Sequence, residues 1–202
     1  MNHKLVNDQI VLATGNKGKV AEFSSLFEQY RISVSPQSEF LVSDVAETGS
    51  TFVENAIIKA RHASRETNLP AIADDSGLVI DALKGAPGIY SARYCGQHGN
   101  DVGNYEKVLR ELEGQHNRSA RFLCVLVFMR FANDPTPIIC QGEWHGKITT
   151  APSGDGGFGY DPIFFLPEHN CTAAELDKSV KNTESHRAKA LKQLMASFSD
   201  HL

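Results

Sequence analysis

Apolar residues along this chain alternate between the spacing of strands and the spacing of helices. Residues 9–14 form an apolar run that predicts a buried strand, and residues 15–19 are rich in Gly and Lys. Apolar side chains then recur at the spacing of one helix face, at Val20, Phe23, Leu26, Phe27 and Tyr30. We therefore expect a strand, a Gly-rich turn and a helix in that order.

A second helix is expected from about residue 50, after a possible short strand at residues 31–34. Thr51 and Glu54 have the spacing of a capping box, which satisfies backbone groups at a helix start. The apolar stripe of this helix consists of Phe52, Ala56, Ala60 and Ala63. A third helix is expected over about residues 104–112, ended by Gly114.

The second half of the chain contains two β-rich runs, residues 120–131 and 137–149, with a hairpin predicted at residues 132–135. A Gly-rich loop follows at residues 153–161, and a last helix is expected over about residues 184–198. Helices interspersed with strands and a hairpin predict an α/β fold with a mixed sheet.

The composition limits the class of protein and the partners that it can bind. The 202 residues are 41% hydrophobic and 22% charged, which is typical of a globular protein that can bury a full core. We expect one domain over residues 1–202, or two lobes that share a sheet. The net charge of −4 provides no overall basic field, so no nucleic-acid partner is expected.

The compartment expected from the sequence is the cytoplasm. No apolar run reaches the length that spans a membrane, and residues 1–8 lack the apolar core of a signal peptide. The four cysteines are widely spaced, and Cys124 and Cys140 lie in apolar runs that favour buried thiols in a reducing environment.

Two adjacent carboxylates, Asp74 and Asp75, interrupt the apolar stretch of residues 70–80. The pattern predicts a strand, a turn at the acids, and a second strand. Neighbouring buried charges are costly unless a cation meets them, and Mg²⁺ prefers carboxylate oxygens. The segment indicates either a metal site or a solvated turn in which Asp and Ser bond to nearby backbone.

The turn after the first strand is a candidate phosphate site. It reads Thr14, Gly15, Asn16, Lys17, Gly18 and Lys19. Free N–H groups and the dipole at a helix start attract anions there. A P-loop is excluded because two residues rather than four separate the glycines, and Val20 stands where Ser or Thr should hold magnesium. The alternative is a plain strand-to-helix turn.

Residues 154–159 formally match the GxGxxG fingerprint of dinucleotide sites. Pro162 follows, and the bulky residues around it predict extended chain instead of the helix that this fingerprint needs. Phe158, Tyr160 and Asp161 could instead bind a nucleobase, since an aromatic face stacks and a carboxylate accepts from ring N–H groups. The alternative is that both aromatic residues belong to the core.

A basic segment at residues 178–187 precedes the expected last helix. Lys181 could neutralise phosphate, while His186 and Arg187 could donate hydrogen bonds to a base carbonyl. The alternative is a solvated helix start. The remaining histidines lack ligand spacing, so zinc is not expected.

Taken together, these segments resemble the inosine/xanthosine triphosphate pyrophosphatase family in its bacterial form, which removes deaminated purine nucleotides from the precursor pool. The matching stretches span nearly the whole chain in the family's order, at residues 12–19, 47–56, 73–78, 85–94, 156–164 and 185–191. The resemblance implies an α/β fold whose mixed central sheet and flanking helices form two lobes around an active-site cleft.

The resemblance also implies roles for individual residues. Thr14 to Lys19 match the triphosphate loop, Asp75 matches a catalytic acid and magnesium ligand, and Glu47 falls where a second metal carboxylate is expected. Ser76 follows as a substrate contact. The base-side loop corresponds to Phe158, Gly159, Tyr160 and Asp161, and the closing basic segment to Lys181, His186 and Arg187.

The implied reaction is attack of water on the α-phosphorus of dITP, ITP, XTP or dXTP, giving the monophosphate and pyrophosphate. This would keep deaminated nucleotides out of DNA and RNA. The resemblance implies Mg²⁺ as cofactor and a homodimer. Val180 stands where many relatives carry an acid, and residues 1–8 have no counterpart. The alternatives are a related pyrophosphatase for pyrimidine or modified nucleotides, and a non-catalytic nucleotide-binding module.

Overall fold

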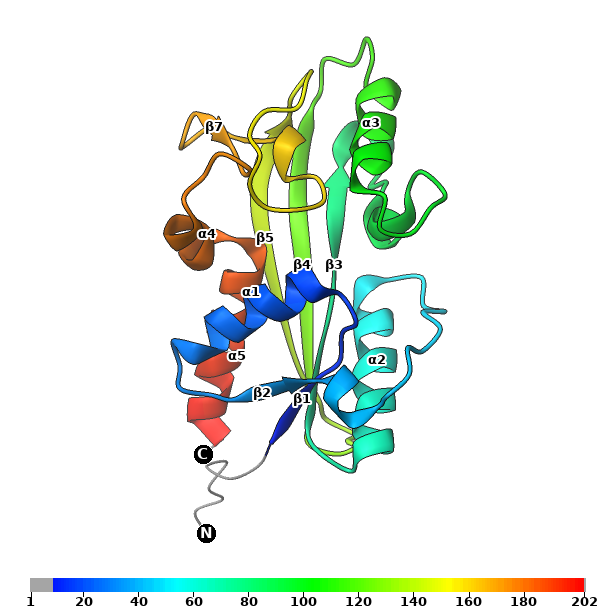
Figure 1. Ribbon diagram of the computed structural model, residues 1–202, viewed down its shortest axis with the longest axis vertical. Helices are drawn as coiled ribbons and strands as arrows, with labels where there is room; N and C mark the ends of the chain where they lie inside the picture. Colours follow the sequence, from blue (N-terminus) through cyan, green and yellow to red (C-terminus); the bar gives the residue numbers. More distant parts are fainter. Residues whose placement is uncertain (1–8, 202) are drawn as a thin grey trace. The chain divides into compact units, whose positions relative to one another are not determined.

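The structure is a computed structural model that describes residues 9–201, with side chains described as far as residue 198. The prediction about a signal peptide in residues 1–8 lies outside the described residues. The helices and strands follow in the order β1 (Ile10–Leu12), α1 (Lys17–Glu28), β2 (Val34–Pro36), α2 (Phe52–Thr67), β3 (Ala71–Ile80), α3 (Asp101–Glu111), β4 (Ser119–Met129), β5 (Ile138–Ile148), β6 (Phe164–Leu166), β7 (Cys171–Thr172), α4 (Lys178–Glu184) and α5 (His186–His201) (Figure 1).

The strands form one mixed sheet in the order β2-β1-β3-β4-β5-β6-β7. β1 pairs in parallel with β2 and β3, whereas β6 pairs antiparallel with β5 and β7. The predicted fold class, a mixed α/β sheet with flanking helices, is confirmed.

The chain divides into two compact units, each described here by itself. Within the described residues, unit 1 comprises residues 9–75, 124–142 and 187–201, and unit 2 comprises residues 76–123 and 143–186. The expectation of one domain over residues 1–202 stays a prediction.

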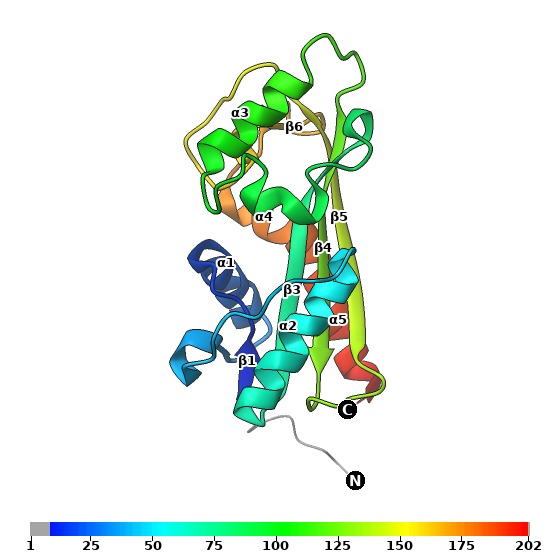
Figure 2. The ribbon, with the colours of Figure 1, turned by 90° about the vertical axis from the view of Figure 1, so that its right-hand side faces the viewer.

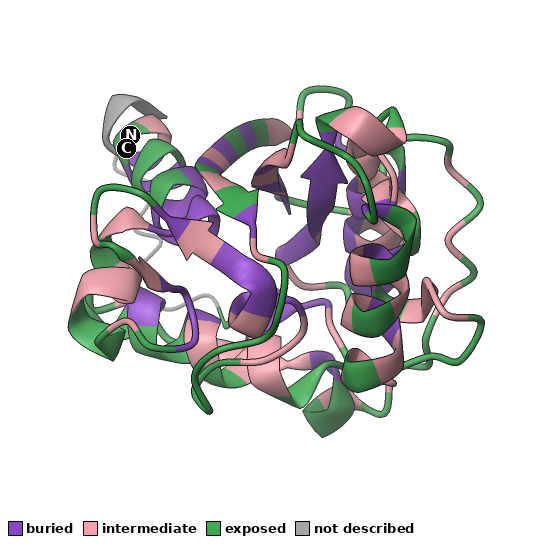
Figure 3. Ribbon diagram, turned by 90° about the horizontal axis from the view of Figure 1, so that it is seen from above, coloured by how far each residue is buried: buried purple, intermediate pink, exposed green. Residues whose placement is uncertain are grey.

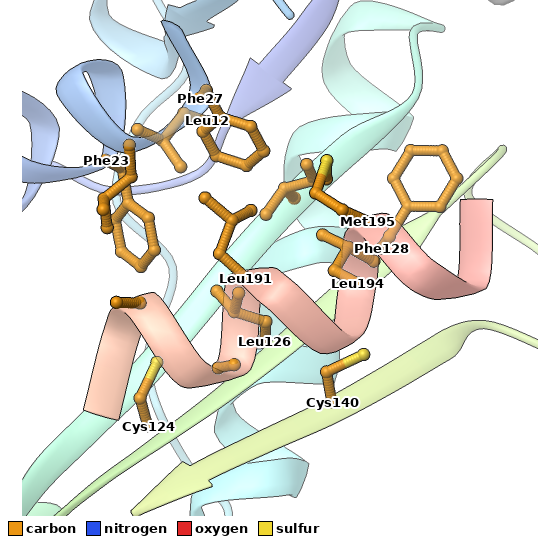
Figure 4. Close-up of a cluster of buried hydrophobic side chains, with 14 of the residues drawn as sticks. Leu12, Phe23, Phe27, Cys124, Leu126, Phe128, Cys140, Leu191, Leu194 and Met195 are labelled. Atoms are coloured by element: carbon orange, nitrogen blue, oxygen red, sulfur yellow. The ribbon is translucent and has the colours of Figure 1, made fainter. Parts of the chain in front are cut away.

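Unit 1 consists of sheet strands covered on both faces by helices. Successive side chains of a strand point to opposite faces. In β4, Cys124, Leu126 and Phe128 accordingly join one cluster with α1 and α5, whereas Val125 and Val127 join another with α2. The first cluster is shown in Figure 4, where Phe23 and Phe27 of α1 and Leu191 of α5 meet the strand residues.

Helix α2 covers the other face of unit 1 and runs alongside β3 (Figures 1 and 2). Its start is fixed by the predicted capping box, because Thr51 Oγ1 accepts from Glu54 N and Glu54 Oε2 accepts from Thr51 N. Ala56, Ala60 and Ala63 are fully buried, and their small size allows the helix to lie close to the strands.

Unit 2 has its own apolar core. Leu78, Val108, Phe122, Trp144 and Phe164 belong to it, contributed by β3, α3, β4, β5 and β6. Figure 3 shows buried residues along the strands and exposed residues along the connecting loops. Within residues 9–201, no helix is both long and apolar enough to cross a bilayer.

The structure corrects the turn predicted at Asp74 and Asp75. Residues 71–80 form one continuous strand, in which both acids are buried. The Asp-Ser-Gly sequence favours a turn locally, but pairing with neighbouring strands and the cations described below outweigh that preference. Tertiary contacts, which a local pattern does not contain, decided this segment.

Three smaller boundaries also differ from the prediction. β2 begins at Val34, where residues 31–34 were expected as a strand. Residues 161–163 form a 3₁₀ turn before β6, where extended chain was expected. The last helical segment is divided, because Ser185 is extended, with ψ 161°, between α4 and α5. The predicted buried thiols Cys124 and Cys140 are confirmed.

Candidate active site

Asp74 and Asp75 point to opposite faces of the sheet because they are neighbours in one strand. Asp74 shares the face of Ile72, which lies in the cluster with α1 and α5. Asp75 shares the face of Ala73, which lies in the cluster with α2. The two acids therefore meet different helices and have different partners.

Asp74 forms a buried ion pair with the phosphate-loop segment. Its Oδ2 lies 2.7 Å from Nζ of Lys19, and its side chain is 0% exposed. Burial alone would raise the pKa of Asp74, but the cations Lys19, Lys59 and Arg187 lower it well below its ordinary value. Asp74 is therefore a carboxylate at neutral pH that fixes the position of the Lys19 ammonium.

The loop after β1 has the predicted strand-turn-helix geometry. Asn16 caps α1, since its Oδ1 accepts from Lys19 N at 3.0 Å. Thr14 Oγ1 in turn accepts from Asn16 N at 3.2 Å. Lys17 is exposed, so of the two lysines in this loop only Lys19 is held by a buried partner.

Asp75 shares one cation with Glu47. Nζ of Lys59 lies 3.0 Å from Asp75 Oδ1 and 2.9 Å from Glu47 Oε1. Although burial lowers the pKa of Lys59, the carboxylates of Asp74, Asp75 and Glu47 raise it to about 12. Burial raises the pKa of Asp75, and this effect outweighs the lowering by the Lys59 ammonium.

Contacts with the start of α2 hold the loop that carries Glu47. Gly49 N donates to Oδ1 of Asn55 at 2.9 Å, and Asn55 Nδ2 lies 3.4 Å from Asp75 Oδ2. A Cβ on Gly49 would lie 2.5 Å from Cβ of Glu54. Only glycine allows this approach, so the loop places Glu47 next to the helix that supplies Lys59.

Glu47 and Asp75 have the donor chemistry that a hard divalent cation requires. Both present carboxylate oxygens, and both already accept from one cation, the Lys59 ammonium. Among the described residues, no group of three or more His, Cys, Asp or Glu side chains could hold a metal. Mg²⁺ is commonly held by one or two carboxylates together with substrate phosphates and water, so this pair fits it.

Arg187 also lies in unit 1, in a buried ion pair. Its Nη1 donates to Glu22 Oε2 at 2.9 Å, and both side chains are largely buried. Glu22 comes from α1, so this pair ties the first turn of α5 to α1.

The predicted base-side residues lie in unit 2. Asp161 is buried, and its Oδ2 accepts from Lys181 Nζ at 2.7 Å and from Phe158 N at 2.9 Å. The Lys181 ammonium also lies 5.4 Å from the centre of the Phe158 ring. A Cβ on Gly157, whose φ is +72°, would lie 2.1 Å from Asp161 Oδ2. Glycine at this position is required for the carboxylate to sit against the loop.

Two further contacts anchor this loop. Gly159 N donates to Asp101 Oδ2 at 2.9 Å, and Tyr160 Oη donates to Ser91 O at 2.7 Å. Tyr160 lies in the apolar core of unit 2, as the alternative interpretation held, so its contact with a nucleotide stays a prediction. Phe158 is only half-buried.

His186 is buried and stacked on Phe122, with ring centres 4.9 Å apart and planes 15° from parallel. Ser76, which follows Asp75 in β3, is half-buried. The predicted site residues thus fall into two groups. Unit 1 holds Thr14 to Lys19, Glu47, Asp75 and Arg187, and unit 2 holds Ser76, Phe158 to Asp161, Lys181 and His186.

Sequence reasoning missed four residues that position these groups, namely Lys59, Glu22, Asp101 and Ser91. A signal existed for Lys59: with Asn55 it forms a polar i, i+4 pair in the Ala-rich α2, and such residues share a helix face. The other three gave no local signal, because each meets its partner across the fold.

Comparison with known proteins gives consistent matches over the length of the chain. The model of the Ham1 family matches residues 10–197. A dITP/XTP pyrophosphatase from Vibrio parahaemolyticus is 62% identical over 95% of this chain and 96% of its own.

Two solved structures extend the comparison to the fold. A HAM1 protein from Coxiella burnetii has a TM-score of 0.88 at 53% identity, covering 95% of this chain and 98% of its own. The Ham1 protein of Staphylococcus aureus has a TM-score of 0.85 at 42% identity, covering 96% and 100%.

Proposed function

The chain belongs to the Ham1 family, and we propose that it hydrolyses deaminated purine nucleoside triphosphates to the monophosphate and pyrophosphate. The substrates are dITP, ITP, XTP and dXTP. One observation carries the proposal: Glu47 and Asp75 direct carboxylate oxygens at a single cation position, 2.9 and 3.0 Å from the Lys59 ammonium. Such a pair suits the metal-assisted transfer of a phosphoryl group.

Mg²⁺ is the metal proposed for Glu47 and Asp75, because both ligands are hard oxygens. When bound, it would neutralise and orient the triphosphate. Asp75 would orient the attacking water and accept its proton. Lys19, held by Asp74 at 2.7 Å, would offset charge on the departing pyrophosphate.

Selection of the base is assigned to unit 2 and the adjoining basic segment. Hypoxanthine and xanthine carry a 6-oxo acceptor and an N1–H donor, whereas adenine has a 6-amino donor and a bare N1. Asp161 would accept from N1–H, and His186 or Arg187 would donate to the 6-oxo group. Lys181, 2.7 Å from Asp161, would hold this carboxylate in position. Adenine would leave these groups unpaired, and such mismatches discriminate strongly.

Product analysis on ITP, with and without Mg²⁺, tests the proposed reaction. Pyrophosphate and IMP are expected with Mg²⁺. Release of inorganic phosphate instead of pyrophosphate would refute the proposed bond cleavage, and binding of ITP without turnover would favour a non-catalytic module. Rates measured for XTP, GTP, ATP and pyrimidine triphosphates under the same conditions test the base preference, and equal rates with ATP would contradict it.

The variant Asp75→Asn tests the assigned catalytic role. We expect kcat to fall by at least about a thousandfold, since general-base catalysis contributes about 10²–10⁴-fold and a metal ligand is lost with it. Asp155→Asn, at an exposed acid of the Gly-rich loop, is the matched control. Circular dichroism should show both variants folded. Turnover of Asp75→Asn within a few-fold of the parent would exclude the assignment.

We further propose a homodimer located in the cytoplasm. Support for both comes from the resemblance and composition of the sequence. Light scattering coupled to size exclusion measures the mass in solution, and cell fractionation locates the chain.

A further inference from the structure

We propose that Lys59 is a built-in counter-cation of the metal site, which the metal displaces when it binds. This inference rests on the metal site of the proposed function and adds an exchange step to it. The ammonium and the metal would alternate at the same pair of oxygens, Glu47 Oε1 and Asp75 Oδ1.

The contacts of Lys59 carry the inference. Its Nζ lies 2.9 Å from Glu47 Oε1 and 3.0 Å from Asp75 Oδ1, and its side chain is only 15% exposed. The surroundings are fixed on each side, because Asp75 lies in β3, Lys59 in α2, and Gly49 holds the Glu47 loop on the first turn of α2. The ammonium therefore stands in a shaped position between two of the predicted ligands.

Geometry and charge indicate exchange instead of shared occupancy. Mg²⁺ binds carboxylate oxygens at about 2.0–2.1 Å, so a metal on these two oxygens would take the space that the ammonium fills. Two cations held about 3 Å apart in a partly buried site would also repel strongly. The ammonium, on a flexible four-carbon stem, is the cation able to move.

The exchange explains how two acids stay assembled without a metal. Asp75 is 6% exposed, and Glu47 lies close to the same ammonium. Without Lys59 the two carboxylates would repel one another, because the ammonium lies within hydrogen-bond distance of both. A monovalent metal ion would only replace the single charge of the ammonium, whereas a divalent ion brings a second positive charge to the two carboxylates. The exchange therefore also favours divalent ions.

The test measures binding of Mg²⁺ alone, without nucleotide, by isothermal titration calorimetry. Lys59→Met is expected to bind Mg²⁺ at least about tenfold more tightly than the parent, because the metal no longer breaks charged hydrogen bonds. Lys19→Met is the matched control, since it removes the same charge from a lysine paired with Asp74, not with the ligand oxygens. The affinity of this control for Mg²⁺ should rise about threefold or less.

Three outcomes would overturn the exchange: unchanged affinity in Lys59→Met, weaker affinity, or a gain no larger than that of Lys19→Met. The double variant Glu47→Gln/Lys59→Met locates the effect and should lose most of the gain. If the double variant kept the full gain in Mg²⁺ affinity, the metal would bind at a site other than Glu47 and Asp75.

A second measurement needs no variant. A crystal structure of the parent chain with Mg²⁺ is expected to show Nζ of Lys59 beyond hydrogen-bond distance of Glu47 or Asp75, with metal on the vacated oxygen. Persistence of both contacts beside bound metal would refute the exchange. Neither measurement uses nucleotide, so the exchange can fail while ITP hydrolysis holds, and the reverse outcome is equally visible.

Discussion

Replacing Lys19 by Met should destabilise the protein, because it leaves the carboxylate of Asp74 buried without its nearest cation. The two groups are 2.7 Å apart, and Asp74 is 0% exposed. Removing one partner of a buried ion pair costs about 3–5 kcal/mol. Lys59 and Arg187 also act on Asp74 and remain in the variant, so we expect a smaller loss, of about 2–3 kcal/mol.

A loss of this size corresponds to a fall in Tm of about 4–12 °C for a chain of this length. Circular dichroism at 222 nm is the suitable probe, because α1, α2 and α5 lie in unit 1 with the ion pair. Fluorescence would report the other unit, which contains the single tryptophan, Trp144.

A double-mutant cycle with Asp74→Asn separates the pair from other effects of the substitutions. The coupling energy should be about 1.5–3 kcal/mol, as for hydrogen bonds between charged groups. Lys17→Met is the control, since this lysine is exposed in the same helix turn. A Lys19→Met variant as stable as Lys17→Met, or a coupling energy near zero, would refute the reasoning.

Two further predictions concern other parts of the chain. The Arg130 guanidinium lowers the pKa of Asp134 to about 2; because this lies below the unfolded value, the pair stabilises the fold above about pH 5 and the effect is lost as the pH falls through 2. Asp134→Asn should therefore lower the free energy of unfolding by about 1–2 kcal/mol at pH 7, a modest loss because the guanidinium is half exposed. Urea unfolding at pH 7 and pH 3 should show that this free energy depends less on pH in the variant than in the parent. Gly157→Ala should raise KM for ITP at least about tenfold, because its Cβ would lie 2.1 Å from Asp161 Oδ2. Gly159→Ala has a similar positive φ with no atom within 4 Å of the added Cβ, so an equal rise in KM there would contradict the role given to the contact with Asp161.

Local patterns in the sequence predicted much of the fold because they depend on neighbours along the chain. The strand, Gly-rich turn and helix at residues 9–30 needed only apolar spacing and a cap, and the structure contains β1 and α1 there. The start of α2 followed from Thr51 and Glu54, whose hydrogen bonds are both present. The hairpin between β4 and β5 followed from a polar break between two apolar runs.

The contacts of the predicted site residues could not be predicted in the same way. Lys19 meets Asp74 across 55 positions of the chain, and Arg187 meets Glu22 across 165. No spacing rule connects residues so far apart. The resemblance named many of these residues, but it did not show that Lys59 joins Glu47 to Asp75.

The sequence by itself determined that two adjacent acids lie in a buried stretch and need cations. It could not determine their separate environments, because a turn would have left them side by side. Tertiary structure made residues 71–80 a continuous strand, and alternation along a strand sends neighbours to opposite faces. Asp74 therefore meets Lys19 of α1, whereas Asp75 meets Lys59 of α2 and, through it, Glu47.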